Sequence, residues 1–243
     1  MKLEGKTAIV TGGSSGIGKA IATAYVEAGA DVVIANRTES TGTAVAEELG
    51  CTYVRTDVRE YDQVEALVEA AVEEYGGLDV MVNNAGIASE RPVGEMELDT
   101  WEEVVRTDLD GVVYGTKAAL PYLQESDGCI VNTASIYGLV GGKGAAAYSA
   151  AKGGVVNFTQ QVAVDYADDG VRVNSICPGF VETPMTEDLL ETDRFYNYVR
   201  ENTPMNRPAQ PEEIAPLAVF LASDDASYMT GANVPIDGGW TAH

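Results

Sequence analysis

Histidine and cysteine are nearly missing from the chain, with one His and three Cys, and this scarcity excludes several kinds of active site. The histidine is His243, the last residue, so a Ser-His-Asp or Cys-His hydrolase arrangement cannot readily be built. Cys51, Cys129 and Cys177 are far apart and form no CxxC pair, which argues against a disulfide framework or a structural zinc site. We expect these cysteines to be buried thiols, no metal to be bound, and proton transfer to use other groups.

Long hydrophobic runs are absent as well. No run approaches the roughly 20 apolar residues that a membrane-spanning helix needs. The first residues, MKLEGKTAIVTGG, enter a strand pattern without a basic and apolar leader. We therefore expect a cytoplasmic protein with no membrane partner. A chain of 243 residues, of which 45% are hydrophobic, suits one domain over residues 1–243.

Basic residues are scarce too: 15 Lys and Arg stand against 38 Asp and Glu, for a net charge of −23. Such a surface repels nucleic acid, so we expect no nucleic-acid partner. The acidic residues are spread along helix faces and loops, so the whole fold must tolerate the charge. Because salt screens this self-repulsion, we hypothesise a salt-loving (halophilic) source organism, with an ordinary mesophile as the alternative.

Seven short β-branched runs alternate with segments of helical period. The runs are nearly continuous in apolar residues, and the segments between them are long enough for crossover helices, which is typical of a buried parallel sheet. The sequence therefore predicts an α/β fold with a doubly wound, parallel, seven-stranded, Rossmann-like sheet. The predicted strands are TAIVT from Thr7, DVVIA from Asp31, TYVRT from Thr52, DVMVN from Asp79, CIVNT from Cys129, VRVNSI from Val171 and ANVPI from Ala232.

One longer irregular segment, rich in proline, runs from Glu182 to Pro211. It follows Pro178-Gly179 and lies beyond the carboxyl end of a predicted strand, where open α/β sheets bind ligands. We interpret it as a substrate lid around residues 183–210. Its aromatic residues Phe195, Tyr196 and Tyr198 could form an apolar wall over the substrate, or a packed helix with no ligand contact.

A glycine-rich turn, Thr11-Gly-Gly-Ser-Ser-Gly-Ile-Gly18, follows the first predicted strand and leads into the helical pattern KAIATAYVEAG. Glycines let the backbone approach a pyrophosphate, and the helix N-terminus offers free N–H groups and a positive dipole end. The spacing differs from G-x-G-x-x-G, so the position after the first strand is what favours a dinucleotide site. We expect cofactor contacts from Gly12, Ser14, Ser15, Gly16, Ile17 and Gly18.

The second predicted strand ends at Asn36-Arg37-Thr38, where NAD-binding proteins commonly present an acid to the ribose. Asn36 carries no charge that would repel a 2′-phosphate, and Arg37 can make charge-assisted hydrogen bonds to one. We therefore expect Asn36, Arg37 and Thr38 to contact the cofactor and favour NADP, with NAD still possible. The alternative is that Arg37 is only a solvated surface residue, and Ser15 supplies no second cation.

Tyr148 and Lys152 stand four residues apart in a helical segment, so the phenol and the ammonium lie on one face, one turn apart. The pKa of a tyrosine phenol is ordinarily about 10. A cation beside the phenol lowers this pKa and favours the phenolate form. Ser135 follows the strand CIVNT and could hydrogen-bond the same substrate oxygen. Taken alone, a Tyr and Lys at this spacing are most often a helix surface pair.

In these features, the chain resembles the short-chain dehydrogenase/reductase family over Lys6 to Gly239. Each motif is weak alone, and the combination is highly specific. The motifs are TGxxxGxG from Thr11 to Gly18, Asp57-Val58, Asn83-Asn84-Ala85-Gly86, Ser135, YxxxK at Tyr148 and Lys152, Pro178-Gly179, and Asp237-Gly238-Gly239.

The resemblance implies a hydride transfer between a nicotinamide and a carbonyl or secondary alcohol. Tyr148 would be the acid or base on the substrate oxygen, Ser135 would polarise that oxygen, and Lys152 would hold the nicotinamide ribose and lower the pKa of Tyr148. The resemblance also implies the strand order 3-2-1-4-5-6-7. The implied cofactor contacts are Asp57 and Val58 at the adenine, Asn84, Ala85 and Gly86 at the ribose, and Val181 and Thr183, just after Pro178 and Gly179, at the nicotinamide carboxamide.

One residue departs from the family pattern. The family usually has asparagine where this chain has Asp108, in Thr107-Asp-Leu-Asp-Gly111. An ionised carboxylate near Lys152 would partly cancel the field that acidifies Tyr148, so we predict an alkaline-shifted oxidation profile. A harmless near-isostere is the alternative. The candidate catalytic residues are thus Ser135, Tyr148, Lys152 and Asp108.

Several functions fit these observations. The leading one is a carbonyl reductase or secondary-alcohol dehydrogenase with a small-molecule substrate. The alternatives are a 3-oxoacyl thioester (acyl carrier protein) reductase, a sugar (glucose) dehydrogenase, and a dinucleotide-sensing protein without turnover. Family members that receive an acyl carrier protein tend to have basic docking residues, but Asp168 and Asp169 stand at one expected place, just before Gly170, and would repel an acidic carrier.

The family usually assembles as a homotetramer through two long helices, here near Thr100–Gln124 and Tyr148–Tyr166. The second helix carries an apolar stripe that could face a partner subunit or the sheet. The stripe consists of Ala151, Val155, Phe158, Val162 and Tyr166.

Overall fold

A parallel sheet with the strand order β3-β2-β1-β4-β5-β6-β7 runs through the centre of the protein, in a computed structural model that describes residues 1–89 and 91–242. The sheet confirms the predicted fold class, and each predicted strand is present with its ends displaced by at most two residues. His243 lies outside the described residues. The strands are β1 (Thr7–Thr11), β2 (Asp31–Asn36), β3 (Thr52–Arg55), β4 (Val80–Asn83), β5 (Cys129–Thr133), β6 (Arg172–Pro178) and β7 (Asn233–Ile236).

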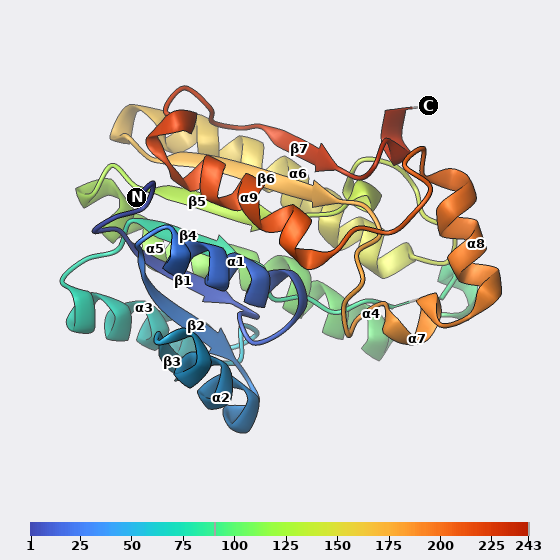
Figure 1. Ribbon diagram of the computed structural model, residues 1–243, viewed down its shortest axis with the longest axis horizontal. Coiled ribbons are helices and arrows are strands. Elements are labelled where there is room, and N and C mark those ends of the chain that lie inside the picture. The colour runs from blue at the N-terminus through green and yellow to red at the C-terminus, as the bar shows by residue number, and fades with distance from the viewer. Residues whose placement is uncertain (90, 243) are drawn as a thin grey trace.

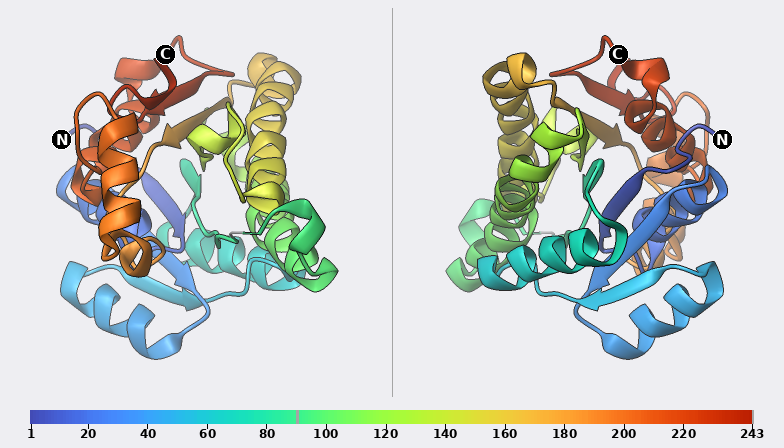
Figure 2. Two further views of the ribbon diagram at one scale, coloured as in Figure 1. Left: turned by 90° about the vertical axis from the view of Figure 1, so that its right-hand side faces the viewer. Right: turned by 90° about the vertical axis from the view of Figure 1, so that its left-hand side faces the viewer.

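Helices cover both faces of the sheet (Figures 1 and 2). Successive side chains of a strand point to opposite faces. In β1, Ala8 and Val10 pack in one apolar cluster and Ile9 packs in the other. Because both faces are buried, the strands have apolar residues at almost every position, which is why they could be predicted. One layer holds α1 (Gly16–Glu27), α2 (Glu39–Leu49) and α9 (Pro211–Ala222), and the other holds α3 (Tyr61–Tyr75), α5 (Gly111–Glu125) and α6 (Ala146–Tyr166).

The apolar stripe of α6 faces the sheet. Ala151, Val155 and Val162 are buried within the protomer, and Phe158 packs against the apolar cluster on the same face. Val164 lies on the other side of the helix and is 78% exposed. The stripe therefore faces the sheet and not a partner subunit.

The first long helix predicted from the family pattern is interrupted. It consists of α4 (Leu98–Val105), a π-helical turn (Arg106–Asp110) and α5 (Gly111–Glu125). A π turn inserts one extra residue into the helical repeat and rotates the side chains that follow. This turn carries Asp108 and directs it into the protein, where it is completely buried.

The segment interpreted as a lid contains two helices, α7 (Glu187–Leu190) and α8 (Asp193–Asn202), and is therefore more regular than its prolines suggest. A β-bridge between Val181 and Ala209 joins its two ends. Figure 1 places both helices beyond the carboxyl ends of the strands.

Among the helices formed by the described residues, none combines the length and the apolarity that a bilayer crossing requires.

Candidate active site

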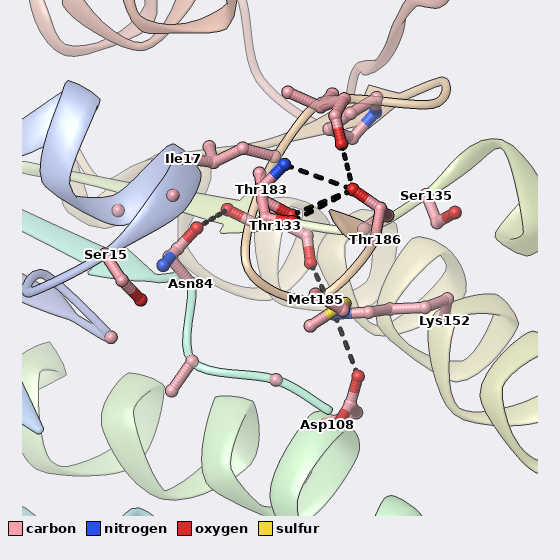
Figure 3. A pocket seen from close by; sticks show the side chains of 18 of the residues that line it. Ser15, Ile17, Asn84, Asp108, Thr133, Ser135, Lys152, Thr183, Met185 and Thr186 are labelled. Atoms are coloured by element: carbon pink, nitrogen blue, oxygen red, sulfur yellow. Dashed lines mark hydrogen bonds and ion pairs between the residues drawn. The ribbon is translucent and has the colours of Figure 1, made fainter. Parts of the chain in front are cut away.

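A cavity of about 190 Å³ opens at the carboxyl ends of β1, β4, β5 and β6 (Figure 3). It brings together residues from most of the chain, as expected for ligand sites in open α/β sheets. The residues predicted from the sequence that line it are Gly12, Ser15, Gly16, Ile17, Gly18, Asn84, Ala85, Gly86, Asp108, Ser135, Tyr148, Lys152, Pro178, Gly179, Val181 and Thr183.

The remaining predicted cofactor residues do not line this cavity. They are Ser14 in the glycine turn and the residues at the neighbouring ends of β2 and β3, namely Asn36, Arg37, Thr38, Asp57 and Val58. Five further residues line the cavity without having been named individually for the site. Thr133 and Ala134 precede Ser135, whereas Pro184, Met185 and Thr186 belong to the segment interpreted as a lid.

The glycine turn between β1 and α1 has the geometry of a phosphate cradle. Gly12 and Gly16 have φ angles of +66° and +50°, which side-chain-bearing residues rarely adopt. A Cβ on Gly18 would lie 2.2 Å from the carbonyl oxygen of Gly12, so the turn closes only with glycine there. Ser15, the N-cap of α1, makes no side-chain capping bond, which leaves the first N–H groups of α1 open to an anion. The turn therefore fits a dinucleotide pyrophosphate.

Asn84 and Thr11 fix the loop after β4 against β1. The Thr11 hydroxyl accepts hydrogen bonds from the backbone N–H groups of Asn84 (2.9 Å) and Ala85 (3.1 Å). The Asn84 side chain donates to the Thr11 carbonyl at 3.0 Å and accepts from the Thr133 hydroxyl at 3.2 Å. These bonds hold the Asn84–Gly86 backbone at the rim of the cavity.

Tyr148 and Lys152 lie on the first turns of α6, with the Lys152 Nζ 5.6 Å from the centre of the Tyr148 ring. Lys152 is only 3% exposed, and its Nζ donates a hydrogen bond of 2.9 Å to the Thr133 carbonyl. The two residues are thus no solvated helix surface pair. The helix fixes their separation, and the end of β5 fixes the direction of the ammonium.

Ser135 faces the same helix from a short 3₁₀ turn (Ile136–Gly138) that follows β5. Its Oγ accepts a hydrogen bond from the backbone N–H of Tyr137 at 3.1 Å. A Cβ on Gly138 would lie 2.6 Å from the Lys152 carbonyl oxygen, so glycine lets this turn pack closely on α6. The close packing brings Ser135 and Tyr148 to one wall of the cavity.

Asp108 lies directly beside Lys152. Its Oδ1 accepts a hydrogen bond of 2.8 Å from the Ile87 N–H, and its Oδ2 lies 3.3 Å from the Lys152 Nζ (Figure 3). The second contact is an ion pair without good hydrogen-bond geometry, so Oδ2 makes no hydrogen bond to the described residues. A Cβ on Gly86 would lie 2.9 Å from Oδ2, so glycine at that position makes room for the carboxylate.

The pKa values of the three buried groups follow from this arrangement. Burial raises the pKa of Asp108, and Lys152 opposes that rise only in part. Burial lowers the pKa of Lys152, but Asp108 and Tyr148 outweigh it and the net direction is upward. Burial also raises the pKa of Tyr148; Lys152 and a Ser135 hydrogen bond oppose the rise, whereas Asp108 adds to it. Tyr148 is therefore a neutral phenol at neutral pH in the protein alone.

The ends of β2 and β3 form an open, basic rim. The Asn36 amide donates to the Thr38 carbonyl at 2.8 Å, so this side chain turns back onto the start of α2. Arg37 is exposed, and Arg55 Nε on the neighbouring strand donates to the Arg37 carbonyl at 3.2 Å. Arg55, which the sequence reasoning missed, therefore places a second cation at this rim.

Asp57 is paired with Arg59, another residue that the sequence reasoning missed. The distance between Arg59 Nη2 and Asp57 Oδ2 is 2.6 Å. The hydrogen bond from Arg59 outweighs burial and lowers the pKa of Asp57. The carboxylate is thus held charged and in a fixed orientation at the end of β3.

Comparison with known proteins gives matches along the whole chain. A family model described as enoyl-(acyl carrier protein) reductase matches residues 12–241. Meso-2,3-butanediol dehydrogenase of Serratia marcescens is 43% identical over 245 residues, which cover 100% of this chain and 97% of that protein. 3beta-hydroxysteroid dehydrogenase 2 of Eggerthella lenta is 41% identical over 251 residues, covering 99% of this chain and 96% of that protein. The crystal structure of gox2181 is similar with a TM-score of 0.97 and 36% identity, covering 100% of this chain and 98% of that one.

Proposed function

Because the chain belongs to the short-chain dehydrogenase/reductase family, and so is an NAD(P)-dependent oxidoreductase acting on CH–OH groups, we propose that it is a secondary-alcohol dehydrogenase with Tyr148 as its proton-transferring residue. One observation carries the proposal: Tyr148, Ser135 and the buried Lys152 share a cavity with the phosphate cradle. The same cavity can therefore hold a nicotinamide and a substrate oxygen together.

In the oxidation direction, Tyr148 takes the hydroxyl proton of the alcohol as a general base. The Ser135 hydroxyl donates a hydrogen bond to the same substrate oxygen and keeps it in place. Lys152 favours the phenolate form of Tyr148 through its charge. A nicotinamide held in this cavity would supply the acceptor for the hydride of the carbinol carbon. In the reduction direction, Tyr148 returns the proton to the carbonyl oxygen.

The cofactor is held by backbone groups and a few side chains in this proposal. The glycine turn and the start of α1 receive the pyrophosphate, and Asn84 to Gly86 line the ribose. Asp57 and Val58 contact the adenine, and Pro178, Gly179, Val181 and Thr183 lie along the nicotinamide. Lys152 holds the nicotinamide ribose, and Asp108 positions Lys152.

The preferred cofactor is NADP, with NAD as the alternative. No acid stands at the end of β2, and Arg37 is exposed there with Arg55 beside it. Two guanidinium groups favour the 2′-phosphate that distinguishes NADP, because each can make charge-assisted hydrogen bonds to it.

The substrate class is a secondary alcohol or its ketone, as the names of the butanediol and hydroxysteroid dehydrogenase relatives suggest. A 3-oxoacyl thioester carried by an acidic carrier protein ranks lower, since Asp168 and Asp169 are exposed on the surface. A sugar dehydrogenase and a sensor without turnover rank below both.

We further propose a cytoplasmic, salt-adapted homotetramer. The exposed acidic side chains and the net charge of −23 support the salt adaptation. Exposed apolar side chains on the two helices named for assembly, Leu98 (78%) on α4 and Val164 (78%) on α6, support the tetramer.

The test is nicotinamide absorbance with ketones, 3-oxoacyl thioesters, sugars and secondary alcohols, with NADPH/NADP and NADH/NAD in parallel at high KCl. Tyr148→Phe is the control, with an expected loss of about 10²- to 10⁴-fold in kcat. Cofactor binding without turnover of any compound would favour the sensor.

A further inference from the structure

Five aromatic rings from four chain segments meet beyond the carboxyl end of β6, and we define them as the aromatic cluster: Tyr137, Phe180, Phe195, Tyr198 and Trp240. Phe180 is central, with ring centres 6.0 Å from Tyr137, 5.5 Å from Phe195 and 5.0 Å from Trp240. Tyr198 completes the cluster at 5.7 Å from Trp240 and 6.1 Å from Phe195. The three contacts of Phe180 and that between Tyr198 and Trp240 are edge-to-face, the arrangement that aromatic quadrupoles prefer.

The cluster adjoins the reaction site directly. Tyr137 comes two residues after Ser135, and its N–H is the one bonded to the Ser135 Oγ. Phe180 follows Gly179, which lines the cavity. A Cβ on Gly142 would lie 2.6 Å from the Tyr137 ring, so the loop before α6 packs on that ring. A displacement of the cluster would therefore move the wall beside Ser135.

The cluster also ties the lid to the C-terminal turn. Asp237 fixes that turn, because its carboxylate accepts hydrogen bonds from the N–H groups of Gly239 (2.9 Å) and Thr241 (2.8 Å). Trp240 is thereby held against Phe180. On α8, Val199 is the fully buried side chain, and Phe195 and Tyr198 meet the cluster from one side of the helix. Figure 2 shows α8 beside the C-terminal segment on the face that lies beyond the strand ends.

The cavity itself limits what can react. Its volume is about 190 Å³, below the roughly 300–1,000 Å³ that is usual for ligand pockets, and a bound nicotinamide would take part of it. Asp108 and Lys152 are the charged side chains among the described residues that line it, and they pair with each other. Val181 and Met185 add apolar side chains to the lining, and Thr183 and Thr186 add uncharged hydroxyl groups. The space left suits a compact and uncharged molecule.

We propose that the aromatic cluster is the latch that holds α8 beyond the strand ends, next to the cavity, and restricts the enzyme to compact, uncharged secondary alcohols. The proposal rests on the proposed function and adds the substrate size and the residues that set it. Without these rings, α8 loses the ring contacts of Phe195 and Tyr198 and the wall beside Ser135 recedes, so that larger alcohols enter.

The first test compares Phe195→Ala and Trp240→Ala with a matched control, Tyr228→Ala, whose side chain is fully exposed (103%) in the turn between α9 and β7. Steady-state kcat/KM is measured for 2-butanol and for a bulky hydroxysteroid. We expect the wild type and the control to prefer 2-butanol strongly, and each cluster variant to lose about tenfold or more of that preference, chiefly through a lower KM for the steroid. Equal preference in all four proteins, or ready turnover of the steroid by the wild type, would overturn the size limit.

The second test needs no turnover. Amide hydrogen exchange across residues 193–202 reports the opening of α8. Exchange should accelerate in Phe195→Ala and Trp240→Ala and stay unchanged in Tyr228→Ala, with exchange in β4 and β5 as an internal check on global stability. Unchanged exchange in α8 overturns the latch. If no alcohol is turned over, the proposed function is rejected together with its size limit. The hydrogen-exchange result still shows whether the aromatic cluster holds α8 in place.

Discussion

The Oδ2 of Asp108 lies 3.3 Å from the Nζ of Lys152, and the two side chains are 0% and 4% exposed. A buried ion pair of this kind is costly to break, since either charge left alone is poorly solvated. Lys152 also faces Tyr148, so its positive charge acts on both a fixed carboxylate and the phenol that the proposed function requires to ionise. The pair links the stability of the fold to the chemistry of the site.

Asp108→Asn should move the pH profile of alcohol oxidation toward lower pH. Asp108 raises the pKa of Tyr148, so its removal lowers that pKa and the base form of Tyr148 is present at lower pH. The measurement is kcat/KM for oxidation against pH. Asp110→Asn, two residues along the same π turn, is the matched control and should leave the profile in place. A profile that is identical in the two variants and the wild type would reject the role of Asp108.

Lys152→Met should lower the free energy of unfolding by about 3 kcal/mol at neutral pH, because it leaves the Asp108 carboxylate buried and unpaired. Burial already raises the pKa of Asp108, and loss of Lys152 raises it further. A carboxyl whose pKa is higher in the folded state favours folding at low pH, and that stability is lost as the pH rises through the folded pKa. The variant should therefore regain stability on acidification, as measured by urea unfolding between neutral and mildly acidic pH.

The double variant Asp108→Asn/Lys152→Met provides the control for that prediction. It should unfold at higher urea concentration than Lys152→Met alone at neutral pH, because no charge is left unpaired. Equal midpoints would show that the buried pair is not the source of the loss.

Gly18→Ala should weaken the binding of NADPH by tenfold or more and destabilise the fold by about 1–3 kcal/mol. The added Cβ would lie only 2.2 Å from the Gly12 carbonyl oxygen, so the glycine turn that forms the phosphate cradle must open. Gly77→Ala is the matched control, since nothing lies within 4 Å of its Cβ and its φ is not positive. Fluorescence titration with NADPH gives the affinity and thermal unfolding gives the stability. Equal affinity in the two variants would contradict the cradle.

Arg37→Gln should raise the Kd of NADPH by about tenfold or more, because one charge-assisted hydrogen bond to the 2′-phosphate is lost. The Kd of NADH, which has no 2′-phosphate, should stay nearly unchanged. Arg55→Gln should act in the same direction if its guanidinium shares the 2′-phosphate. NADH is the internal control in each titration. A parallel loss of affinity for both cofactors would assign these arginines a structural role.

Thermal unfolding in a KCl series tests the salt adaptation. The exposed acidic groups repel one another most at low ionic strength, so the midpoint should rise as molar KCl is added. Sucrose at equal osmolality controls for general effects of solutes. A midpoint that does not respond to KCl would reject the hypothesis.

The sequence was informative where a feature is local or periodic. The strands are continuous apolar runs, so Ile9 and Val10 identify β1 although they point to opposite faces. The glycine turn and the Tyr148–Lys152 spacing are also local patterns, and the structure brings them into one cavity. The inward direction of the α6 stripe, by contrast, depends on which elements pack against it.

Features that depend on distant contacts could not be predicted. The π turn at Asp108 looks like ordinary helix in the sequence, because a single inserted residue leaves composition unchanged. The pairing of Asp57 with Arg59 requires a bend that only the folded loop shows. The aromatic cluster joins Tyr137 to Trp240, which are a hundred residues apart and share no motif.

The lining of the cavity extends along the chain from Gly12, after β1, to Thr186, after β6. Because the lining comes from the ends of β1, β4, β5 and β6 and from the segment after β6, a nascent chain has no complete cavity until that segment has been synthesised and has packed. Nucleotide affinity is thus a property of the finished fold alone. A ligand that binds only the native state stabilises it by RT ln(1 + [L]/Kd), so a nucleotide bound in this cavity would raise the free energy of unfolding of the finished fold.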